Sequence, residues 1–206
     1  MSGLFITLEG GEGAGKSTQL DHIRSWLAAR GREVVVTREP GGTVLSELLR
    51  DLVLHGDHPE MSPHTELLLI FAARAQHIDE VIRPALERDA IVLCDRFTDA
   101  SYAYQGGGRG LPVEHIGALE KVVHRGLQPD VTVLLDLPVQ EGLRRARGRG
   151  SEDRFENESE AFLQRVRDAY LSRARAFPGR FTVIDASLER DAVWGQIRAV
   201  LERHVP

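Results

Sequence analysis

The sequence contains little cysteine, few aromatic residues and no long apolar run. Its single cysteine, Cys94, excludes an intrachain disulfide framework and supplies too few thiolates for a structural zinc site. No stretch is long and apolar enough to span a membrane, and no basic leader precedes the first apolar segment, Leu4–Leu8. We therefore expect no membrane association and a cytoplasmic location.

The sequence also lacks a surplus of positive charge. It has 26 lysine and arginine residues against 31 aspartate and glutamate residues, which gives a net charge of −5. Proteins that hold nucleic acids through their phosphates usually carry a basic surplus, so we expect no nucleic-acid partner. The hydrophobic share of 42% is typical of a soluble globular protein, and 206 residues fit a single domain, 1–206.

Short apolar runs typical of strands alternate along the chain with amphipathic runs typical of helices. Short β-branched or apolar runs predict strands at Leu4–Leu8, Val34–Thr37, Ile91–Cys94, Val131–Leu135 and Phe181–Ile184. Amphipathic runs predict helices at Gly15–Arg30, Val44–Leu54, Pro63–Glu87 (interrupted near Pro84), Val113–Arg125, Val139–Arg147, Ala161–Arg175 and Ala192–Arg203. Strands separated by helices predict an α/β fold, with a five-stranded parallel sheet and helices on both faces.

The predicted helix after Pro63 is unusual because Leu67–Ala73 is apolar on every side. A helix with one face in water does not need such a run. Either the helix is buried within the domain or one face meets a second subunit, and the second interpretation is the one we favour.

A glycine-rich segment between the first strand and first helix has the spacing G-x-x-x-x-G-K-[ST]. It consists of Gly10, Gly11, Glu12, Gly13, Ala14, Gly15, Lys16 and Ser17. Glycines let consecutive N–H groups turn inward toward phosphate oxygens, and the helix that follows adds its positive dipole end. The lysine is long enough to reach the β- and γ-phosphates, and the serine hydroxyl can ligate Mg²⁺. The segment predicts a phosphate-binding loop (P-loop) for a nucleoside triphosphate.

Two further clusters follow the ends of predicted strands. One is Thr37–Thr43, and the other runs from Asp95 through Ser101 to Gly110. Ligands of open α/β sheets bind beyond the carboxyl ends of the strands, so arginines and acids there suit an anionic acceptor and a metal. Asp95 and Asp136 each close an apolar strand, and spacing alone leaves both as candidates for the magnesium-binding acid.

In combination these motifs resemble bacterial thymidylate kinases. The P-loop, Thr37–Thr43, Phe71–His77, Asp95–Phe97 and Tyr104–Gly110 occur in the order seen in that family, across essentially the whole chain. The resemblance implies a P-loop nucleoside monophosphate kinase fold with a small mobile lid at about 144–156 and a homodimer. It also implies the reaction ATP + dTMP to ADP + dTDP, with Mg²⁺, in dTTP synthesis.

The resemblance also assigns expected roles by position. Lys16, Arg96 and Asp95 correspond to catalytic residues, Gly10–Ser17 to the ATP site, and Ser17 and Asp95 to the metal site. The acceptor dTMP is expected to contact Glu39, Arg50, Phe71, Arg74, Arg96, Ser101 and Gln105. Within these, Arg50 and Arg96 correspond to the residues that hold the acceptor phosphate, and Arg74 to the donor at the thymine edge.

One position departs from the pattern of the family, and another distinguishes between two types of family member. Many members place a base-stacking aromatic residue four positions before the arginine that matches Arg74, where this chain has Ile70, and Phe71 lies one position later. One type of family member carries a catalytic arginine in the P-loop, where this chain has Gly13. The other type supplies it from the lid, and Arg149 is the best match among the lid arginines.

Two alternatives remain open at this stage. A nucleoside monophosphate kinase of other base specificity would share the P-loop and the acceptor arginines. A regulatory P-loop switch would bind partners rather than convert metabolites, although the Asn-Lys-x-Asp run that specifies guanine in such switches is absent.

Overall fold

A computed structural model describes residues 3–55, 61–146, 154–155 and 158–205 of the chain. None of the helices in this described part combines the length and the apolar character that crossing a bilayer requires.

The centre of the molecule is a parallel sheet of five strands in the order β2-β3-β1-β4-β5. The strands are β1 (Leu4–Gly10), β2 (Val34–Arg38), β3 (Ile91–Asp95), β4 (Val131–Asp136) and β5 (Phe181–Asp185). Each predicted strand is confirmed, and each extends one or two residues further at its carboxyl end. The extra residues include Asp95 and Asp136, so these two acids close their strands as the sequence indicates.

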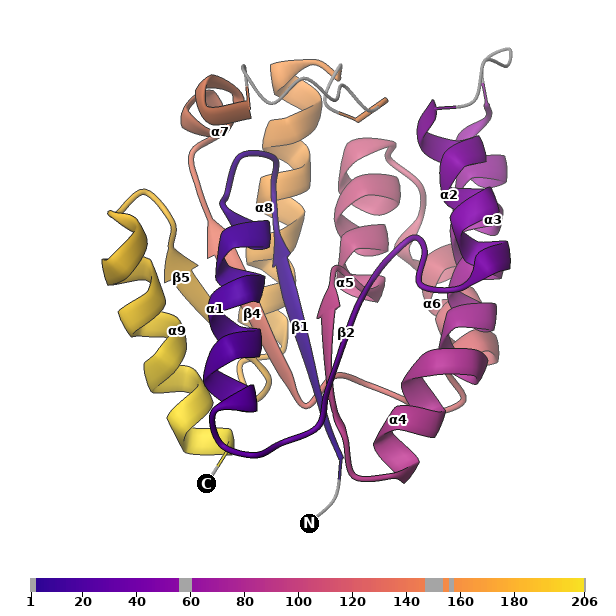
Figure 1. Cartoon of the computed structure of the whole chain (residues 1–206). Coiled ribbons are helices and arrows are strands. Elements are labelled where there is room, and N and C mark those ends of the chain that lie inside the picture. The colour runs from indigo at the N-terminus through magenta and orange to yellow at the C-terminus, as the bar shows by residue number, and fades with distance from the viewer. Residues whose placement is uncertain (1–2, 56–60, 147–153, 156–157, 206) are drawn as a thin grey trace.

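Helices cover both faces of the sheet (Figure 1). The helical segments are α1 (Lys16–Ala28), α2 (Val44–His55), α3 (Pro63–His77), α4 (Arg83–Glu87), α5 (Thr98–Ser101), α6 (Val113–His124), α7 (Val139–Ala146), α8 (Glu160–Ala176) and α9 (Arg190–His204), with π-helical turns η1 (Ile78–Ile82) and η2 (Tyr102–Gly108). Helices α1 and α9 pack on one face, while α4, α5 and α8 contact the other. The described part of the chain therefore has the α/β architecture that the sequence predicts, a parallel sheet with helices on both faces.

Strand β1 illustrates how the sequence divides between the two faces. Successive side chains of a strand point to opposite sides, so Ile6 and Leu8 share one face while Phe5 and Glu9 share the other. Ile6 and Leu8 lie in the apolar cluster formed with α1 and α9. Phe5 is packed in the opposite cluster with Ile78 and Ile82, and Glu9 is fully buried on that side. A carboxyl group therefore lies inside the core directly before the P-loop.

The predicted helix Pro63–Glu87 is confirmed as a continuous helical stretch. Ser62 caps it by accepting a hydrogen bond from the Thr65 N–H at 3.2 Å, and Pro63 occupies the first turn, where its missing N–H costs nothing. The interruption expected near Pro84 takes the form of the π-helical turn η1, which ends directly before α4. A π turn is one way for a helix to adjust its hydrogen bonding before a proline.

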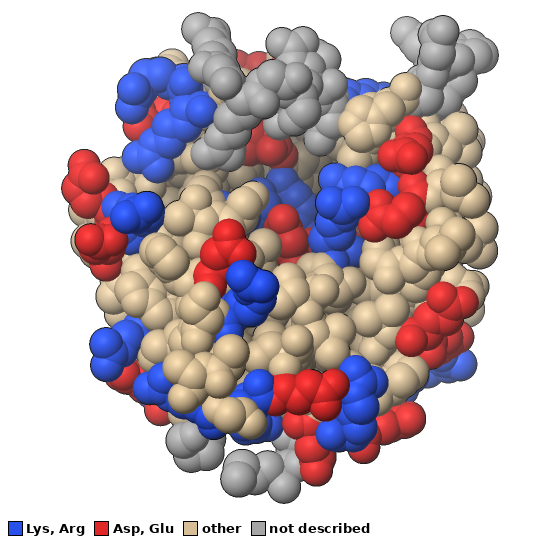
Figure 2. All heavy atoms as spheres, viewed as in Figure 1, with Lys and Arg blue, Asp and Glu red and all other residues tan. Residues whose placement is uncertain are grey.

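Because the sheet is parallel, all five strands end at the same edge. In Figure 1 this edge lies opposite the two termini, and the loop between β1 and α1 lies along it. Figure 2 shows lysine and arginine side chains interleaved with acidic ones over this view, and both kinds occur in the hollow near its centre.

Candidate active site

The P-loop begins where β1 ends at Gly10 and finishes where α1 begins at Lys16. Gly13 and Gly15 have φ angles of 70° and 86°, a left-handed conformation that residues with a Cβ rarely adopt. A Cβ at Gly13 would also lie 2.2 Å from the Gly142 carbonyl oxygen of α7. The loop is therefore held close to α7, and no side chain, an arginine included, fits at Gly13 without a shift of the backbone.

Lys16 folds back over the loop that precedes it. Its Nζ donates to the carbonyl oxygens of Gly10 and Gly11, each at 3.3 Å. Burial lowers the pKa of Lys16, and the nearby charge of Arg96 lowers it further, while Glu12 and other acids oppose the shift. Among the described residues, this partly buried ammonium has two long hydrogen bonds to carbonyls, and it is suited to exchange them for phosphate oxygens.

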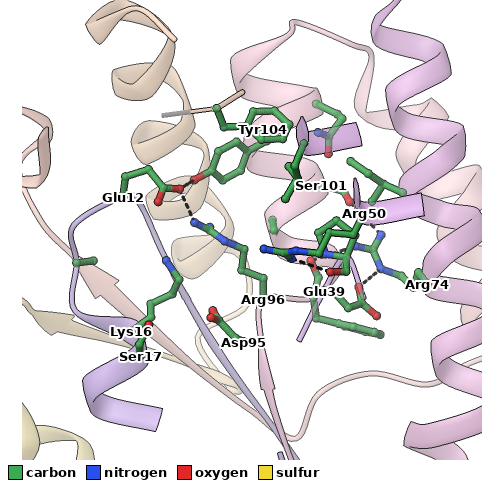
Figure 3. A pocket seen from close by; sticks show the side chains of 18 of the residues that line it. Glu12, Lys16, Ser17, Glu39, Arg50, Arg74, Asp95, Arg96, Ser101 and Tyr104 are labelled. Atoms are coloured by element: carbon green, nitrogen blue, oxygen red, sulfur yellow. Dashed lines mark hydrogen bonds and ion pairs between the residues drawn. The ribbon is translucent and has the colours of Figure 1, made fainter. Parts of the chain in front are cut away.

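Asp95 and Ser17 supply oxygen atoms on the same side of the cavity as Lys16 (Figure 3). The Oδ1 atom of Asp95 is buried and has no hydrogen-bond partner in the described part of the chain. The competing candidate, Asp136, is already engaged, because both of its oxygens accept from Arg167, at 2.7 and 2.9 Å. Of the two candidates, Asp95 is therefore the one with an unpaired oxygen in the described part of the chain, and a hard cation such as Mg²⁺ could be held there.

The backbone of Arg96 is held in an uncommon conformation. Its φ is 66°, in the left-handed region. Two hydrogen bonds to β1 secure it: the Arg96 N–H donates to the Leu8 carbonyl at 3.0 Å, and the Phe97 N–H donates to the Glu9 carboxylate at 2.7 Å. This turn directs the Arg96 side chain back toward the P-loop instead of along the strand.

The Arg96 side chain lies between the two ends of the cavity (Figure 3). It donates to the Gly10 carbonyl at 2.8 Å, to Glu12 at 2.7 Å and to the Tyr170 hydroxyl at 3.2 Å. Tyr104 donates to the same Glu12 oxygen at 2.9 Å. These contacts link the P-loop to the segment that follows β3.

The other end of the cavity is built around Arg74 of α3. Arg74 is 2% exposed and donates through Nε to Glu39 at 2.6 Å and through Nη1 to Ser101 at 2.9 Å. Burial raises the pKa of Glu39, but the charge of Arg74 and hydrogen bonds from His77 and Arg74 outweigh it and hold that pKa below its ordinary value. Glu39 is therefore ionised and accepts hydrogen bonds only.

Arg50 and Gln105 complete this end. Arg50 donates to the Pro40 carbonyl at 2.7 Å, and Gln105 donates to the buried Glu66 at 2.9 Å. Gln105 keeps its amide oxygen as a further acceptor for a ligand.

A single cavity of about 330 Å³ joins the two ends. The predicted site residues that line it are Glu12, Gly13, Ala14, Gly15, Lys16, Ser17, Glu39, Arg50, Arg74, Asp95, Arg96, Ser101 and Gln105. Gly10 and Gly11 contribute backbone carbonyls to Lys16 without lining it. Arg149 and most of the predicted lid lie outside the described residues.

The expectation that Phe71 lines the site is not met. Phe71 is buried in a cluster with Leu67, Leu111 and Ile116, while Ile70 lines the cavity. Adjacent helical residues point about 100° apart, so only one of the two can face the ligand. Phe71 instead packs against the guanidinium of Arg74, whose Cζ lies 4.6 Å from the centre of the Phe71 ring.

Several lining residues were not predicted from the sequence. They are Pro40, Leu54, Ile70, Phe97, Ala100, Tyr104 and Phe155. Tyr104 and Phe97 lie inside segments that the sequence marks, so their position in those motifs was an available signal. Glu9 and Tyr170, which bond to each other at 2.8 Å behind Arg96, had no such signal because 161 residues separate them.

Comparison with known proteins identifies several similar chains. A family model described as thymidylate kinase matches residues 8–197. A thymidylate kinase of Pseudomonas putida (strain GB-1) is 59% identical over 201 residues, which cover 98% of this chain and 96% of the relative. One from Pseudomonas syringae pv. tomato is 60% identical over 187 residues, covering 91% and 89%. A crystal structure of thymidylate kinase from Ehrlichia chaffeensis matches with a TM-score of 0.79 at 33% identity, covering 98% of this chain and 99% of that one.

Proposed function

Because the chain belongs to the thymidylate kinase family, and so transfers a phosphoryl group from ATP to dTMP, we propose that the cavity described above is where this transfer takes place. The observation that supports this proposal is the continuity of one cavity from P-loop residues such as Lys16 to base-side residues such as Arg74 and Gln105. We further propose that residues 1–206 form one kinase domain, with the lid at about 144–156.

In this proposal the P-loop binds the ATP phosphates. The backbone N–H groups of Gly13–Ser17 and the positive end of α1 suit the phosphate oxygens. Lys16 exchanges its two carbonyl partners for the β- and γ-phosphates. Ser17 and Asp95 would hold Mg²⁺, whose charge offsets the repulsion between the two anionic substrates.

The acceptor dTMP occupies the other end of the cavity. Arg96 and Arg50 bind its phosphate, and Arg74 donates to the thymine edge from its position between Glu39 and Ser101. Ser101 and Gln105 supply further polar contacts to the base. The acceptor phosphate is already an anionic nucleophile, so these residues need to align it and offset charge rather than remove a proton.

The lid supplies the remaining positive charge. We propose Arg149 as the arginine that contacts the transferred phosphoryl group, as the positional match to lid-arginine members of the family indicates. Lid closure also excludes water, which would otherwise compete with dTMP as the acceptor.

We also propose that two copies of the chain pair through α2 and α3. Leu45, Leu48 and Leu52 form an exposed apolar stripe along α2, and Leu68 of α3 is 56% exposed. Helices α2 and α3 pack against each other, so these side chains extend one apolar surface. Leu48→Glu should shift the sedimentation coefficient from dimer to monomer, whereas Leu188→Glu, an exposed leucine elsewhere, should not.

An acceptor profile tests the proposed function directly. Purified protein with ATP and Mg²⁺ is assayed for ADP release with dTMP, dUMP, AMP, GMP and CMP. We expect dTMP to give the highest kcat/KM. Conversion of another monophosphate in its place would refute the base-side assignment, and conversion of none would refute the cavity as a transfer site. A cytoplasmic location accords with this role in nucleotide synthesis.

A further inference from the structure

Behind the base-side end of the cavity lies a buried histidine that does not line it. His77 is the last residue of α3, and its side chain is completely buried. Its Nδ1 lies 2.9 Å from Oε1 of Glu39, and its Nε2 lies 2.6 Å from Oγ1 of Thr37. Both ring nitrogens therefore have partners: Thr37 belongs to β2, and Glu39 directly follows that strand.

These contacts assign the protons. Glu39 is ionised and accepts only, so Nδ1 carries the proton and donates to Oε1. In the neutral ring Nε2 then accepts from the Thr37 hydroxyl. In this neutral tautomer the donors run from Thr37 to His77 to Glu39, and the chain ends at the carboxylate that accepts from Arg74.

The two oxygens of Glu39 are used by different partners. Oε2 accepts from Nε of Arg74 at 2.6 Å, and Oε1 accepts from His77. A carboxylate bound at one oxygen can still rotate about its last carbon–carbon bond, whereas contacts at both oxygens fix its plane. Because Arg74 meets Glu39 through a planar guanidinium, the plane of the carboxylate sets the direction in which the rest of that guanidinium points.

The backbone at Gly42 lies close against His77. Gly42 has a φ of 89°, and a Cβ there would lie 2.5 Å from Cδ2 of His77 and 2.6 Å from the Thr37 hydroxyl. The backbone of the Pro40–Thr43 segment thus packs directly against the hydrogen-bonded side chains of His77 and Thr37. This enclosure holds the imidazole in one orientation.

We propose that His77 is a positioning residue for the acceptor: it fixes the plane of Glu39, which in turn aims Arg74 at the pyrimidine base. The inference rests on the proposed function, because it requires Arg74 to contact the base. His77 itself touches no substrate, so its effect appears in acceptor binding and not in ATP binding or in the transfer step.

Two amide substitutions separate the roles of the ring nitrogens. The side-chain nitrogen of asparagine replaces Nδ1, so His77→Asn retains the bond to Glu39. The nitrogen of glutamine replaces Nε2 and donates to the Thr37 hydroxyl oxygen, so His77→Gln keeps a hydrogen bond to Thr37, with its direction reversed, and loses the one to Glu39. We expect His77→Leu and His77→Gln to raise the KM for dTMP about tenfold, as the loss of one hydrogen bond to a charged group implies, and His77→Asn to restore most of it. The KM for ATP and kcat should stay within about threefold of the parent values.

A base-free acceptor analogue provides a readout that general damage to the fold would not reproduce. The inhibition constant of 2-deoxyribose 5-phosphate should be the same in the parent and in His77→Leu, because this molecule has no base for Arg74 to contact. Ile197→Val, a mild core change on α9, serves as the control for lost stability and should leave the KM for dTMP unchanged.

The KM of Arg74→Gln for dTMP is measured alongside, to distinguish failure of the base-side assignment from failure of the role proposed for His77. If Arg74→Gln leaves the KM for dTMP unchanged, the base-side assignment is wrong and the inference falls with it. If Arg74→Gln raises that KM while His77→Leu does not, only the inference is wrong. Equal effects of His77→Leu on dTMP and ATP, or equal KM values for the asparagine and glutamine variants, would also overturn it.

Discussion

Arg96 and Glu12 form an ion pair across the middle of the cavity, with Nη2 of Arg96 lying 2.7 Å from Oε1 of Glu12 and each side chain 16% exposed. The pair joins the segment after β3 to the P-loop. A guanidinium has donors for both a carboxylate and a phosphate, so Arg96 can bind an incoming acceptor phosphate while Glu12 maintains its orientation. In the proposed assignment, Arg96 therefore serves the acceptor site while Glu12 anchors it to the P-loop.

Arg96→Ala tests this position. Removing a charged donor to a phosphate costs about 1.5–3 kcal/mol, so we expect the KM for dTMP to rise roughly 10- to 100-fold while the KM for ATP changes much less. Initial rates at saturating ATP measure it. Arg167→Ala, which removes an arginine paired with Asp136 outside this cavity, is the matched control. An unchanged KM for dTMP in Arg96→Ala would move the phosphate site elsewhere.

Lys16→Met tests the P-loop. Methionine has a similar length and no charge, and burial already disfavours the charged form of Lys16, so the variant should fold. The loss of the charge opposite the β- and γ-phosphates should lower kcat by at least about 10³-fold. Circular dichroism and the rate of ADP release together check both statements. Lys121→Met, on the exposed surface of α6, should leave the rate unchanged, and normal turnover by Lys16→Met would refute the assignment.

The parts of the site that sequence patterns predict are those that local geometry determines. A P-loop needs its glycines, lysine and serine at fixed spacing, so Gly10–Ser17 can be recognised from the sequence alone. Acids and arginines at strand ends can also be predicted from the sequence, because parallel strands end at one edge of the sheet, where ligands bind. Which of Asp95 and Asp136 keeps an oxygen available for a cation could not be predicted, since this depends on Arg167 of α8, 31 residues beyond Asp136 in the sequence.

The segment Thr98–Gly108 shows why local patterns fail elsewhere. Three consecutive glycines argue against a helix, yet the chain is helical through α5 and η2. The glycines are explained by packing against α8: a Cβ at Gly107 would lie 2.6 Å from that of Ala169, and one at Gly108 would lie 2.5 Å from the Phe162 ring. Tertiary contact here overrides propensity, and no local pattern reveals the partner helix.

Gly13→Ala tests the contact between the P-loop and α7. The left-handed φ of 70° and the 2.2 Å approach of the Gly142 oxygen both oppose a methyl group. We expect a loss of about 1–3 kcal/mol in the free energy of unfolding and a higher KM for ATP. Urea denaturation and ATP-dependent rates measure these. Gly195→Ala of α9 has open space at its Cβ and should not destabilise the protein, so equal effects of the two variants would contradict the argument.

Glu9→Gln tests the buried carboxylate behind Arg96. Burial, reinforced by the nearby Asp99, raises the pKa of Glu9 from 4.5 to about 8. Between these values the folded protein binds a proton at Glu9 that the unfolded chain does not, so the contribution of Glu9 to stability is greatest below pH 4.5 and is lost as pH rises toward 8. The contribution of this residue should have a slope of up to about 1.4 kcal/mol per pH unit. Glutamine mimics the protonated acid and should flatten the pH dependence of the free energy of unfolding, whereas an unchanged slope would show that Glu9 stays ionised.

Arg149→Ala tests the source of the transition-state charge. The backbone around Gly13 has no space for an arginine side chain. Three of the arginines around the lid already have acidic partners: Arg144 and Arg145 donate to Glu141, and Arg154 pairs with Glu66 at 3.5 Å. Arg147 and Arg149 lie outside the described residues, and positional similarity favours Arg149.

We expect kcat of Arg149→Ala to fall about 10³-fold, the low end for an arginine that contacts a transferring phosphoryl group. The KM for dTMP should change little, because this contact forms in the transition state. Single-turnover measurements separate the chemical step from product release. Arg144→Ala, at an exposed position, should retain the parent rate. If Arg147→Ala or Arg154→Ala produces the large loss in place of Arg149→Ala, another arginine supplies the charge, and the positional match with the family does not hold within the lid.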